Sequence, residues 1–519
     1  MSRTRRAAWG IVTNYASTAV MAVAGFVLVP IVLHYVSRED YGLWATIGQA
    51  LGYLALLDLG VGSAVVRRAA QLRERDDTEI VSRVISTAVS LYCLLGLVIL
   101  IVGLSLAALL PRWSAIPNDR TSVAVTIFII MVVYTAVSLP LRIATSALIG
   151  YQHIAAANLI NFAANLLTPI VAVVMLVFGA GLLALPVGTV LAGLLSAIAA
   201  IIILFRVVPN LRLSFRGASR EEARELFRVS WQLFLANVGV VLIYQTDNLV
   251  IAAGAGLTAV TVYTLTSRLP LYAMPLVFAI GDSCLPGIIE LYQKGDRDHL
   301  RVIYLRVMRL TAAAGLGVAV VTVAYNKSFM RLWVGDQNYG GMTLTLLLAL
   351  IMLHRVMRQV ASLIVIGSGK LKGIVYMALL EAALNLALSL WWVRYYGING
   401  VALGTVVAGA LTSGWHVAYF VSRELRMSVF EYVWRGMGPP LVCAVPAAGL
   451  AVLLNNLYPA TSWPRLFISA AAVASAYAVS YLFIGFATEE RRAMYARLVR
   501  FYRALRMPSR ARLLLKENP

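Results

Sequence analysis

Charged side chains interrupt several otherwise apolar stretches of this sequence, and their chemistry is the first clue to what the chain does. The candidates for chemistry are Asp58, Asp247, Arg268, Arg355 and Glu381. A charge at the centre of a bilayer costs about 2.5–3.5 kcal/mol on insertion scales, so in a membrane such side chains face the protein interior or a water-filled cavity. A guanidinium there can bind phosphate through charge-assisted hydrogen bonds. A carboxylate there can hold a cation, accept a proton or pair with an arginine.

The composition identifies the apolar stretches as membrane spans. The chain has 519 residues, of which 61% are hydrophobic and 13% are charged, whereas soluble chains are roughly 45–50% apolar and about 25% charged. A net charge of +21 would suggest a nucleic-acid partner in a soluble protein. Here the basic residues lie between apolar runs, as membrane topology requires. We therefore expect contacts with membrane lipids and no nucleic-acid partner.

Several classes of chemistry lack their motifs. The three cysteines lie far apart in apolar runs, and the five histidines have no metal-ligand spacing. No glycine-rich loop ends in a GK[ST] motif, so ATP is not the direct energy source. No predicted outer loop exceeds about 15 residues, which leaves no soluble domain to carry catalytic groups. The sequence thus predicts no metal, no organic cofactor and no enzymatic activity.

Apolar runs long enough to cross a bilayer occur fourteen times. Backbone groups in lipid need partners within their own segment, so each span is expected to be a helix. The predicted inner segments hold 33 Lys and Arg against 7 in the outer loops, which predicts that both termini are cytoplasmic. The predicted fold is an all-α polytopic membrane protein, with spans at 10–33, 41–66, 84–110, 121–148, 154–178, 182–205, 229–252, 257–281, 303–325, 341–366, 373–393, 398–421, 437–456 and 465–487.

Internal repetition predicts how the spans are grouped. The stretch "NLINFAANLL", with Asn165, is echoed by "ALLEAALNLA", with Asn385, and "TVLAG" is echoed by "TVVAG". We expect two pseudo-symmetric six-helix lobes in parallel orientation, an architecture of transporters with the substrate site between the lobes near the midplane. The expected organisation is an N-terminal lobe at 1–205, a basic cytoplasmic linker at 206–228, a C-terminal lobe at 229–421, two appended spans in 422–487 and a basic amphipathic tail at 488–519.

Polar stripes on the spans predict a cavity. Arg268 and Tyr272 share one face of the eighth span with two threonines, at helical spacing. Asn237 belongs to a similar stripe in the seventh span, and Asn14 occupies the matching position in the first. Arg355 heads a third stripe in the tenth span. Two lobes facing each other across these stripes would enclose a polar, partly cationic cavity.

The carboxylates have more than one interpretation. Asp58 fits an ion pair with an arginine that holds the second span against a neighbour, or a gating role. Glu381 fits a proton or cation site, or the partner of Arg355. Asp247, near the outer end of the seventh span, is a further candidate for gating, ion pairing or ion coupling. Asn385 is expected to join helices by hydrogen bonds rather than to bind a ligand.

The first two spans resemble a known family. The stretch "VPIVLHYVSREDYGLWATIGQALGYLALLDLGVGSAVVR", residues 29–67, is similar to spans one and two of bacterial polysaccharide flippases. These belong to the multidrug/oligosaccharidyl-lipid/polysaccharide (MOP) exporter superfamily. The matching features are Pro30, the Tyr41-Gly42-Leu43-Trp44 motif and the Leu57-Asp58-Leu59-Gly60 motif. "YGINGVALGTVVAG" at 396–409 resembles the repeat end of the family, and the resemblance extends over nearly the whole chain.

The resemblance implies a function. Such proteins flip a polyprenyl-diphosphate-linked oligosaccharide across the bacterial cytoplasmic (inner) membrane by alternating access, for export or assembly of a surface polysaccharide. It implies H⁺ or Na⁺ as the coupling ion and other polysaccharide-assembly proteins as partners. On this interpretation Arg268 binds the diphosphate, with Arg355 second, and Asp58 orients an arginine or helps to gate.

Three alternatives stay open. Peptidoglycan-precursor flippases of the superfamily carry arginines in the first span, and this span has none after Arg6. Exporters of cationic drugs tend to have an acidic residue shortly after a proline there, whereas Pro30 is followed by Ile31, Val32 and Leu33. The embedded charges are balanced, however, so charge alone does not exclude a cation exporter. The third alternative is a scaffold of a glycan-assembly complex that transports nothing.

Overall fold

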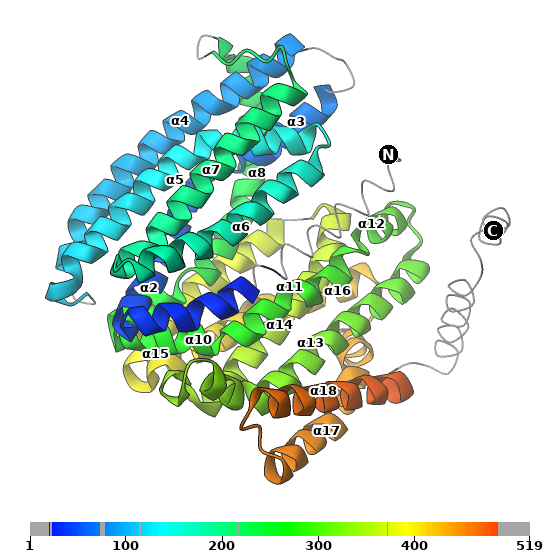
Figure 1. Cartoon of the computed structure of the whole chain (residues 1–519). Coiled ribbons are helices and arrows are strands. Elements are labelled where there is room, and N and C mark those ends of the chain that lie inside the picture. Colours follow the sequence, from blue (N-terminus) through cyan, green and yellow to red (C-terminus); the bar gives the residue numbers. More distant parts are fainter. Residues whose placement is uncertain are drawn as a thin grey trace, which may run out of the picture. The chain divides into compact units, whose positions relative to one another are not determined.

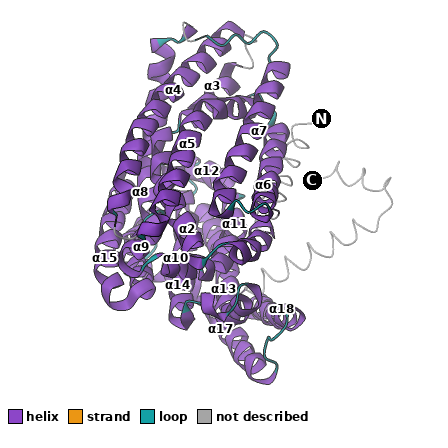
Figure 2. Cartoon of the chain, turned by 60° about the vertical axis from the view of Figure 1, so that its left-hand side comes forward, coloured by secondary structure: helices purple, strands orange, loops and turns teal. Residues whose placement is uncertain are grey.

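The computed structural model describes residues 20, 23–72, 78–113, 116–214, 217–370 and 372–485. These residues form helices joined by short connections, and no strand occurs among them (Figures 1 and 2). The chain divides into two compact units. Unit one comprises Met1–Arg268, Trp333–Leu347 and Leu371–Gly414, and unit two comprises Leu269–Leu332, Leu348–Lys370 and Trp415–Pro519. The division falls inside the predicted second lobe, so the predicted lobe boundaries stay a prediction.

Ten helices of the described chain are long and apolar enough to cross a membrane. Their bounds are Thr78–Arg112, Asn118–Gly150, Ile154–Val177, Gly181–Val207, Arg268–Gln293, Arg297–Trp333, Gly341–Ser368, Val375–Glu424, Val429–Leu457 and Trp463–Gly485. One of them, Val375–Glu424, covers two predicted spans, because α15 (Lys372–Gly409) continues through a non-helical residue at Gly397. The chain is therefore a multi-pass helical membrane protein, while the count of fourteen spans and the cytoplasmic location of both termini stay predictions.

Three predicted spans are broken into shorter helices in the structure. The second consists of α2 (Arg38–Leu54), the 3₁₀ turn η1 (Ala55–Asp58) and α3 (Val61–Leu72). The seventh consists of α8 (Arg220–Tyr244) and α9 (Asp247–Ala255), and the eighth of α10 (Leu257–Thr266) and α11 (Arg268–Asp282). The candidate residues Asp58, Asp247 and Arg268 all lie at these breaks. A break in the helical hydrogen-bond ladder is tolerated at membrane depth where neighbouring helices or a cavity satisfy the freed backbone groups.

Four long helices of unit one pack side by side (Figure 1). They are α4 (Thr78–Leu109), α5 (Thr121–Gly150), α6 (Ile154–Val177) and α7 (Ala184–Val207). The predicted linker runs alongside the first turns of α4. There the hydroxyls of three α4 residues accept backbone N–H groups of the linker at 2.9–3.2 Å, in the pairs Ser82–Arg212, Ser86–Ser214 and Thr87–Ser219. Ser219 in turn caps α8 by accepting the N–H of Glu221. These contacts fix the position at which the linker ends and α8 begins.

An ion pair joins the neighbouring end of α3 to the same helix start. Arg68 donates to both carboxylate oxygens of Glu222, from Nε at 3.2 Å and from Nη2 at 2.8 Å. Two parallel bonds of this kind match the fork of the guanidinium to the carboxylate. The Glu222 carboxylate raises the pKa of the Arg68 guanidinium, which is charged at any physiological pH. The acidic first turn of α8 also complements the positive end of the helix dipole.

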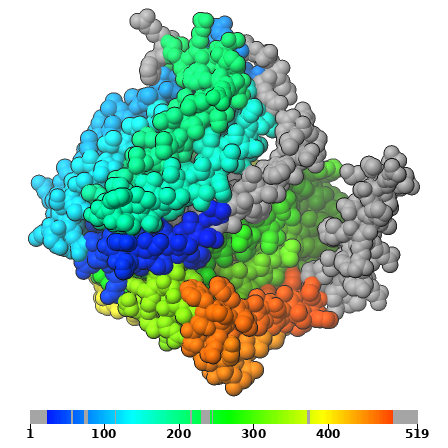
Figure 3. Space-filling view, in the orientation of Figure 1, coloured from blue at the N-terminus to red at the C-terminus, as the bar shows by residue number. Residues whose placement is uncertain are grey.

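Pro30 explains how the first described helix, Val23–Tyr35, is fastened. Proline has no N–H to donate to the carbonyl four residues earlier, which here belongs to Phe26. That carbonyl instead accepts the indole Nε1–H of Trp333 at 2.7 Å, and the Phe26 and Trp333 rings meet edge to face with centroids 5.3 Å apart. Figure 3 shows this helix, dark blue, at the surface beside the blue-green helices of the same unit.

Trp333→Phe is expected to destabilise unit one. The ring contact with Phe26 would largely survive, but the carbonyl would lose its donor. A polar group left unpaired in a poorly hydrated place costs about 1–3 kcal/mol, so the thermal unfolding temperature measured in detergent should fall. Trp391→Phe is the matched control, because Trp391 is an exposed tryptophan of the same unit. Equal shifts for the two variants would contradict the role of the indole donor.

Unit two is built on α13 (Arg297–Trp333) and the helices around it. These are α12 (Leu285–Gln293), most of α14 (Gly341–Ser368), α16 (Trp415–Glu424), α17 (Val429–Leu457) and α18 (Trp463–Ser480). In its core Tyr304 stacks on Tyr432 with ring centroids 6.3 Å apart. At one end Glu424 accepts Tyr292 Oη at 2.6 Å and Lys370 Nζ at 2.5 Å, so one carboxylate joins α12, α16 and the segment after α14. The predicted tail at 488–519 lies outside the described residues.

Candidate functional site

A polar layer forms where α2 packs against α9 and α10, all within unit one. Every fourth residue of α2 from Tyr41 to Tyr53 faces this layer, because residues four apart share one face of a helix. The approach is close at Gly42. A Cβ atom at this position would overlap the carbonyl oxygen of Leu257 and would lie 2.9 Å from Thr261 Oγ1. Only glycine lets the two backbones meet here.

Two hydrogen bonds join α2 to the α10–α11 segment at this end of the layer. Thr261 Oγ1 donates to the carbonyl of Arg38 at 2.5 Å, and Arg268 Nη2 donates to Tyr41 Oη at 2.9 Å. Arg268 is half-buried and is the first residue of α11. The residue predicted as the diphosphate ligand therefore lies beside the motif that carries the family resemblance.

Asp247 and its neighbours tie α2 to α9. Tyr53 Oη lies 2.6 Å from Thr246 Oγ1, which donates onward to the carbonyl of Leu242, so the tyrosine is the donor. The backbone N–H of Asn248 donates to Gln49 Oε1 at 2.8 Å. Asp247 itself is only 6% exposed and accepts Tyr263 Oη at 2.8 Å. A carboxylate in the first turn of α9 is also favoured by the helix dipole. We call this whole set of contacts the α2–α9–α10 layer.

Asp58 lies at the break between α2 and α3. Leu59 and Gly60 follow it with φ of 53° and 76°, which turns the chain before α3 begins. The hydrogen-bond partner that the structure gives Asp58 is the hydroxyl of Tyr92 on α4, not the arginine that the sequence suggested. The same hydroxyl accepts the backbone N–H of Gly62 at 2.8 Å. Tyr92 thus fastens the break to α4, and the gating role of Asp58 stays a prediction.

Tyr92→Phe is expected to destabilise the protein more than Asp58→Asn. The phenylalanine removes the donor to a carboxylate and the acceptor for Gly62, and a hydrogen bond to a charged group is worth about 1.5–3 kcal/mol. An asparagine at position 58 can still accept the Tyr92 hydroxyl. Thermal unfolding of the two variants in detergent measures the difference. If Asp58→Asn proves the more destabilising change, the carboxylate has an essential charged partner instead.

Two further predicted residues lie on α15 of unit one. Glu381 is 3% exposed. Asn385, one turn later, accepts Ser389 Oγ at 3.0 Å and Thr405 Oγ1 at 3.2 Å through its side-chain oxygen. The expectation that Asn385 joins helical segments is thereby confirmed. The structure places Glu381 next to this polar contact, and its role as an ion site or as a partner of Arg355 stays a prediction.

The remaining predicted site residues lie outside the α2–α9–α10 layer. Arg355 on α14 and Tyr272 on α11 are half-buried residues of unit two. Asn14 lies outside the described residues, and so does the side chain of Asn237. The grouping of these four with Arg268 around one cavity stays a prediction.

The sequence analysis missed Gln49, Tyr53 and Tyr92. A usable signal existed for the first two, because Tyr41, Gln49 and Tyr53 recur at multiples of four residues and so share one face of α2. Tyr92 gave no such signal. It is a single tyrosine in a long apolar run, and its importance follows only from the turn at Leu59 and Gly60, which brings Asp58 to it.

Comparisons with known proteins identify the class of fold. The chain is similar to a lipid II flippase, MurJ, in an inward closed conformation, with 13% identity, 91% of this chain and 98% of that chain covered, and a TM-score of 0.68. It is also similar to an inward-facing multidrug resistance MATE transporter of the MOP superfamily, with 15% identity, 81% and 99% coverage and a TM-score of 0.67. An outward-facing MATE structure is 16% identical, with 80% of this chain and 96% of that chain covered and a TM-score of 0.56. The fold is that of the MOP superfamily.

The family follows from the sequence itself. The family model described as polysaccharide biosynthesis protein matches residues 9–291, which is more than half of the chain. The chain therefore belongs to this family, as the resemblance of its first two spans implied. No curated protein matches the sequence. The solved structures with the same fold named above are described as transporters and a flippase.

Proposed function

We propose that the protein flips a polyprenyl-diphosphate-linked oligosaccharide across the bacterial cytoplasmic membrane, for export or assembly of a surface polysaccharide. The observation that carries the proposal is the half-buried guanidinium of Arg268, held by Tyr41 in a member of the polysaccharide biosynthesis family. A glycan and a diphosphate cannot cross about 30 Å of hydrocarbon unaided. They need a polar passage with a cation for the phosphates, and a guanidinium offers its donors in the fork geometry that phosphate oxygens match.

The α2–α9–α10 layer supplies the second element of this proposal, a gate. With both termini in the cytoplasm, α2 begins on the outer side, so the layer closes the outer end of the passage. Besides the close approach of Gly42 to Leu257, its contacts are hydrogen bonds that join polar side chains to one another and to backbone groups, and water can replace these bonds when the layer opens. The burial of Asp247 and Thr261, which are 6% and 0% exposed, supports a layer that is closed in this structure.

A second candidate function, export of an organic cation coupled to an ion, is favoured by one observation. Asp247 and Glu381 are carboxylates that are 6% and 3% exposed. Buried carboxylates can take up a proton or bind a cation in exchange for substrate. In the first proposal the same two residues serve the coupling ion, H⁺ or Na⁺.

Native mass spectrometry of the protein, extracted gently from its own host, tests the proposal. We expect a retained lipid with a polyprenyl diphosphate and a glycan. Reconstituted vesicles then measure whether a labelled lipid of that class changes leaflet with the protein present. Retention of small organic cations in place of the lipid would favour the exporter. A protein that neither retains nor flips such a lipid, and that co-purifies with glycosyltransferases, would be a scaffold.

A further inference from the structure

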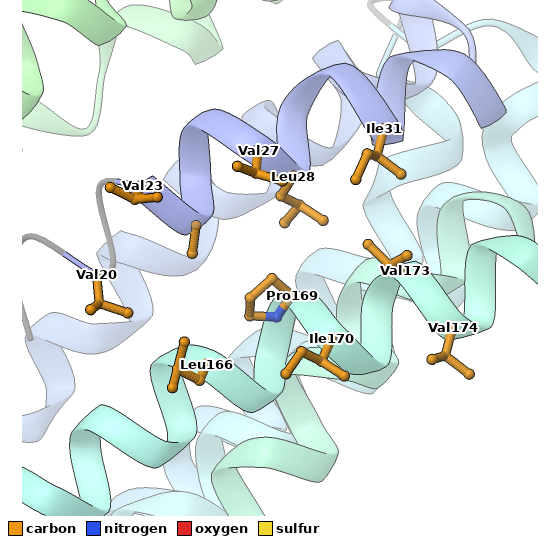
Figure 4. A pocket seen from close by; sticks show the side chains of 11 residues that line it. Val20, Val23, Val27, Leu28, Ile31, Leu166, Pro169, Ile170, Val173 and Val174 are labelled. Atoms are coloured by element: carbon orange, nitrogen blue, oxygen red, sulfur yellow. The ribbon is translucent and has the colours of Figure 1, made fainter.

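An apolar groove lies between the first described helix and α6, within unit one. One wall is a stripe of Val20, Val23, Ala24, Val27, Leu28 and Ile31, at the three- and four-residue spacing of one helix face. The other wall is a matching stripe of Leu166, Pro169, Ile170, Val173 and Val174. Figure 4 shows the two sets of side chains facing across the same space. The groove has a volume of about 570 Å³, within the usual range of small-ligand sites.

The two stripes face each other without filling the space between them. Val23 and Val27 are 62% and 58% exposed, and Ile170 opposite them is 56% exposed. Protein interiors are normally packed as densely as organic crystals, so facing apolar stripes would be expected to interdigitate. No lining side chain offers a hydrogen bond, so the groove has nothing with which to bind a polar group. The chemistry that fits the groove is a hydrocarbon chain.

Both walls are fixed from behind. On one side the Phe26 ring meets the Trp333 ring, and the Trp333 indole donates to the backbone carbonyl of Phe26. On the other side α6 meets α7 so closely that a Cβ at Gly188 would lie 2.7 Å from the carbonyl oxygen of Thr168 and 3.2 Å from Ala172 Cβ. Thr168 and Ala172 thus face α7, while their neighbours Pro169 and Val173 face the groove. Each helix is held by its opposite face, so the separation between the two stripes is built into the packing.

We propose that this groove binds the polyprenyl tail of the lipid-linked substrate, an inference that rests on the proposed function and names a site for a part of that substrate. Its helical lining from Val23 to Ile31 is about 12 Å long at 1.5 Å per residue, enough for two or more isoprene units. The segment that lines it continues after Tyr35 into α2, where Tyr41 contacts Arg268. The same stretch of chain therefore carries one wall of the groove and, through Tyr41, contacts the cation proposed for the diphosphate.

Photo-crosslinking tests the proposal with the full chain in vesicles of phosphatidylethanolamine and phosphatidylglycerol. The probe is a long-chain polyprenyl diphosphate with a diazirine in its tail. We expect crosslinks on peptides 20–31 and 166–174. Two variants fill the groove from opposite walls, Val27→Trp and Val173→Trp, so that one remains if the other fails to fold. Each should lower crosslinking at least tenfold. Leu195→Trp is the matched control, because Leu195 is a similarly exposed apolar residue on α7 outside the groove.

The outcomes separate the tail site from the proposed function. Crosslinks that map elsewhere, or that persist in both filled variants, overturn the groove as the tail site while the lipid still binds. Loss of the crosslinks on raising the phospholipid-to-probe ratio also overturns it, because acyl chains then occupy the groove. A short-chain, water-soluble isoprenyl diphosphate reports on the headgroup alone. If wild-type protein binds neither this probe nor the long one, the proposed function fails and the tail site fails with it.

Discussion

Replacing Gly42 by valine is expected to hold α2 and α10 apart and to abolish most transport, while the protein still folds. Any Cβ at this position would overlap the carbonyl oxygen of Leu257. The partner is backbone, so a side-chain rotation cannot relieve the clash. Overpacking of this kind costs about 1–3 kcal/mol. If that cost falls only on the closed form of the layer, the equilibrium shifts toward the open form by about 5–150-fold.

Thiol protection measures this shift without assuming a substrate. Thr261 is fully buried in the layer, so a Thr261→Cys variant with the native cysteines removed should resist a membrane-impermeant thiol reagent. Adding Gly42→Val should make the introduced thiol reactive. Gly48→Val is the matched control on the same helix, because nothing lies within 4 Å of a Cβ there. If the introduced thiol stays protected and flipping stays normal in Gly42→Val, the close approach of the two helices is not needed for function.

Arg268→Ala is expected to have the second largest effect. It should lower both the binding of the lipid-linked substrate and the rate at which that substrate is flipped. A hydrogen bond to a charged group is worth about 1.5–3 kcal/mol, which corresponds to roughly 10–150-fold in affinity. Arg268→Lys keeps the charge but loses the fork of donors, so we expect an intermediate loss. Retention of the lipid in native mass spectrometry and the flipping rate in vesicles report the two losses separately.

Tyr41→Phe separates substrate binding from packing. It removes the hydroxyl that Arg268 contacts and leaves the guanidinium in place. If Arg268 binds the diphosphate, Tyr41→Phe should have a much smaller effect than Arg268→Ala. If the only function of Arg268 is to hold α2, the two variants should lower flipping equally and should leave retention of the lipid unchanged.

The sequence predicted the parts of the fold that depend on local pattern. Long apolar runs became helices such as α6 and α13, and the resemblance of the first two spans agrees with the family that the chain belongs to. The pattern did not predict the breaks in the seventh and eighth spans, because mean hydropathy over a window does not register a change of backbone direction. In the second span the Asp58-Leu59-Gly60 motif indicated a kink, but not that Leu59, a non-glycine residue, would adopt φ of 53°.

The candidate site was predicted in its residue types but not in its pairs. Asp58, Asp247 and Arg268 were identified because a charge within an apolar run is costly in a membrane, so it requires a polar partner or a function. Their partners are Tyr92, Tyr263 and Tyr41, three tyrosines, where the sequence suggested an arginine for Asp58. A tyrosine hydroxyl offers a polar partner at little desolvation cost. Because it is also common in plain apolar packing, sequence alone could not single out these three.

The α2–α9–α10 layer joins segments that are synthesised at very different times, and this affects how the protein is inserted into the membrane. Tyr41 is synthesised 227 residues before Arg268, and Tyr53 is synthesised 193 residues before Thr246. A translocon that inserts each span as it emerges therefore receives α2 with its polar face unpartnered, and it receives Asp58 at a cost of about 2.5–3.5 kcal/mol on insertion scales if the residue is at mid-depth. The second span cannot reach its native surroundings until the eighth has left the ribosome. Correct assembly of this membrane protein is thus decided late, after half of the chain has been made.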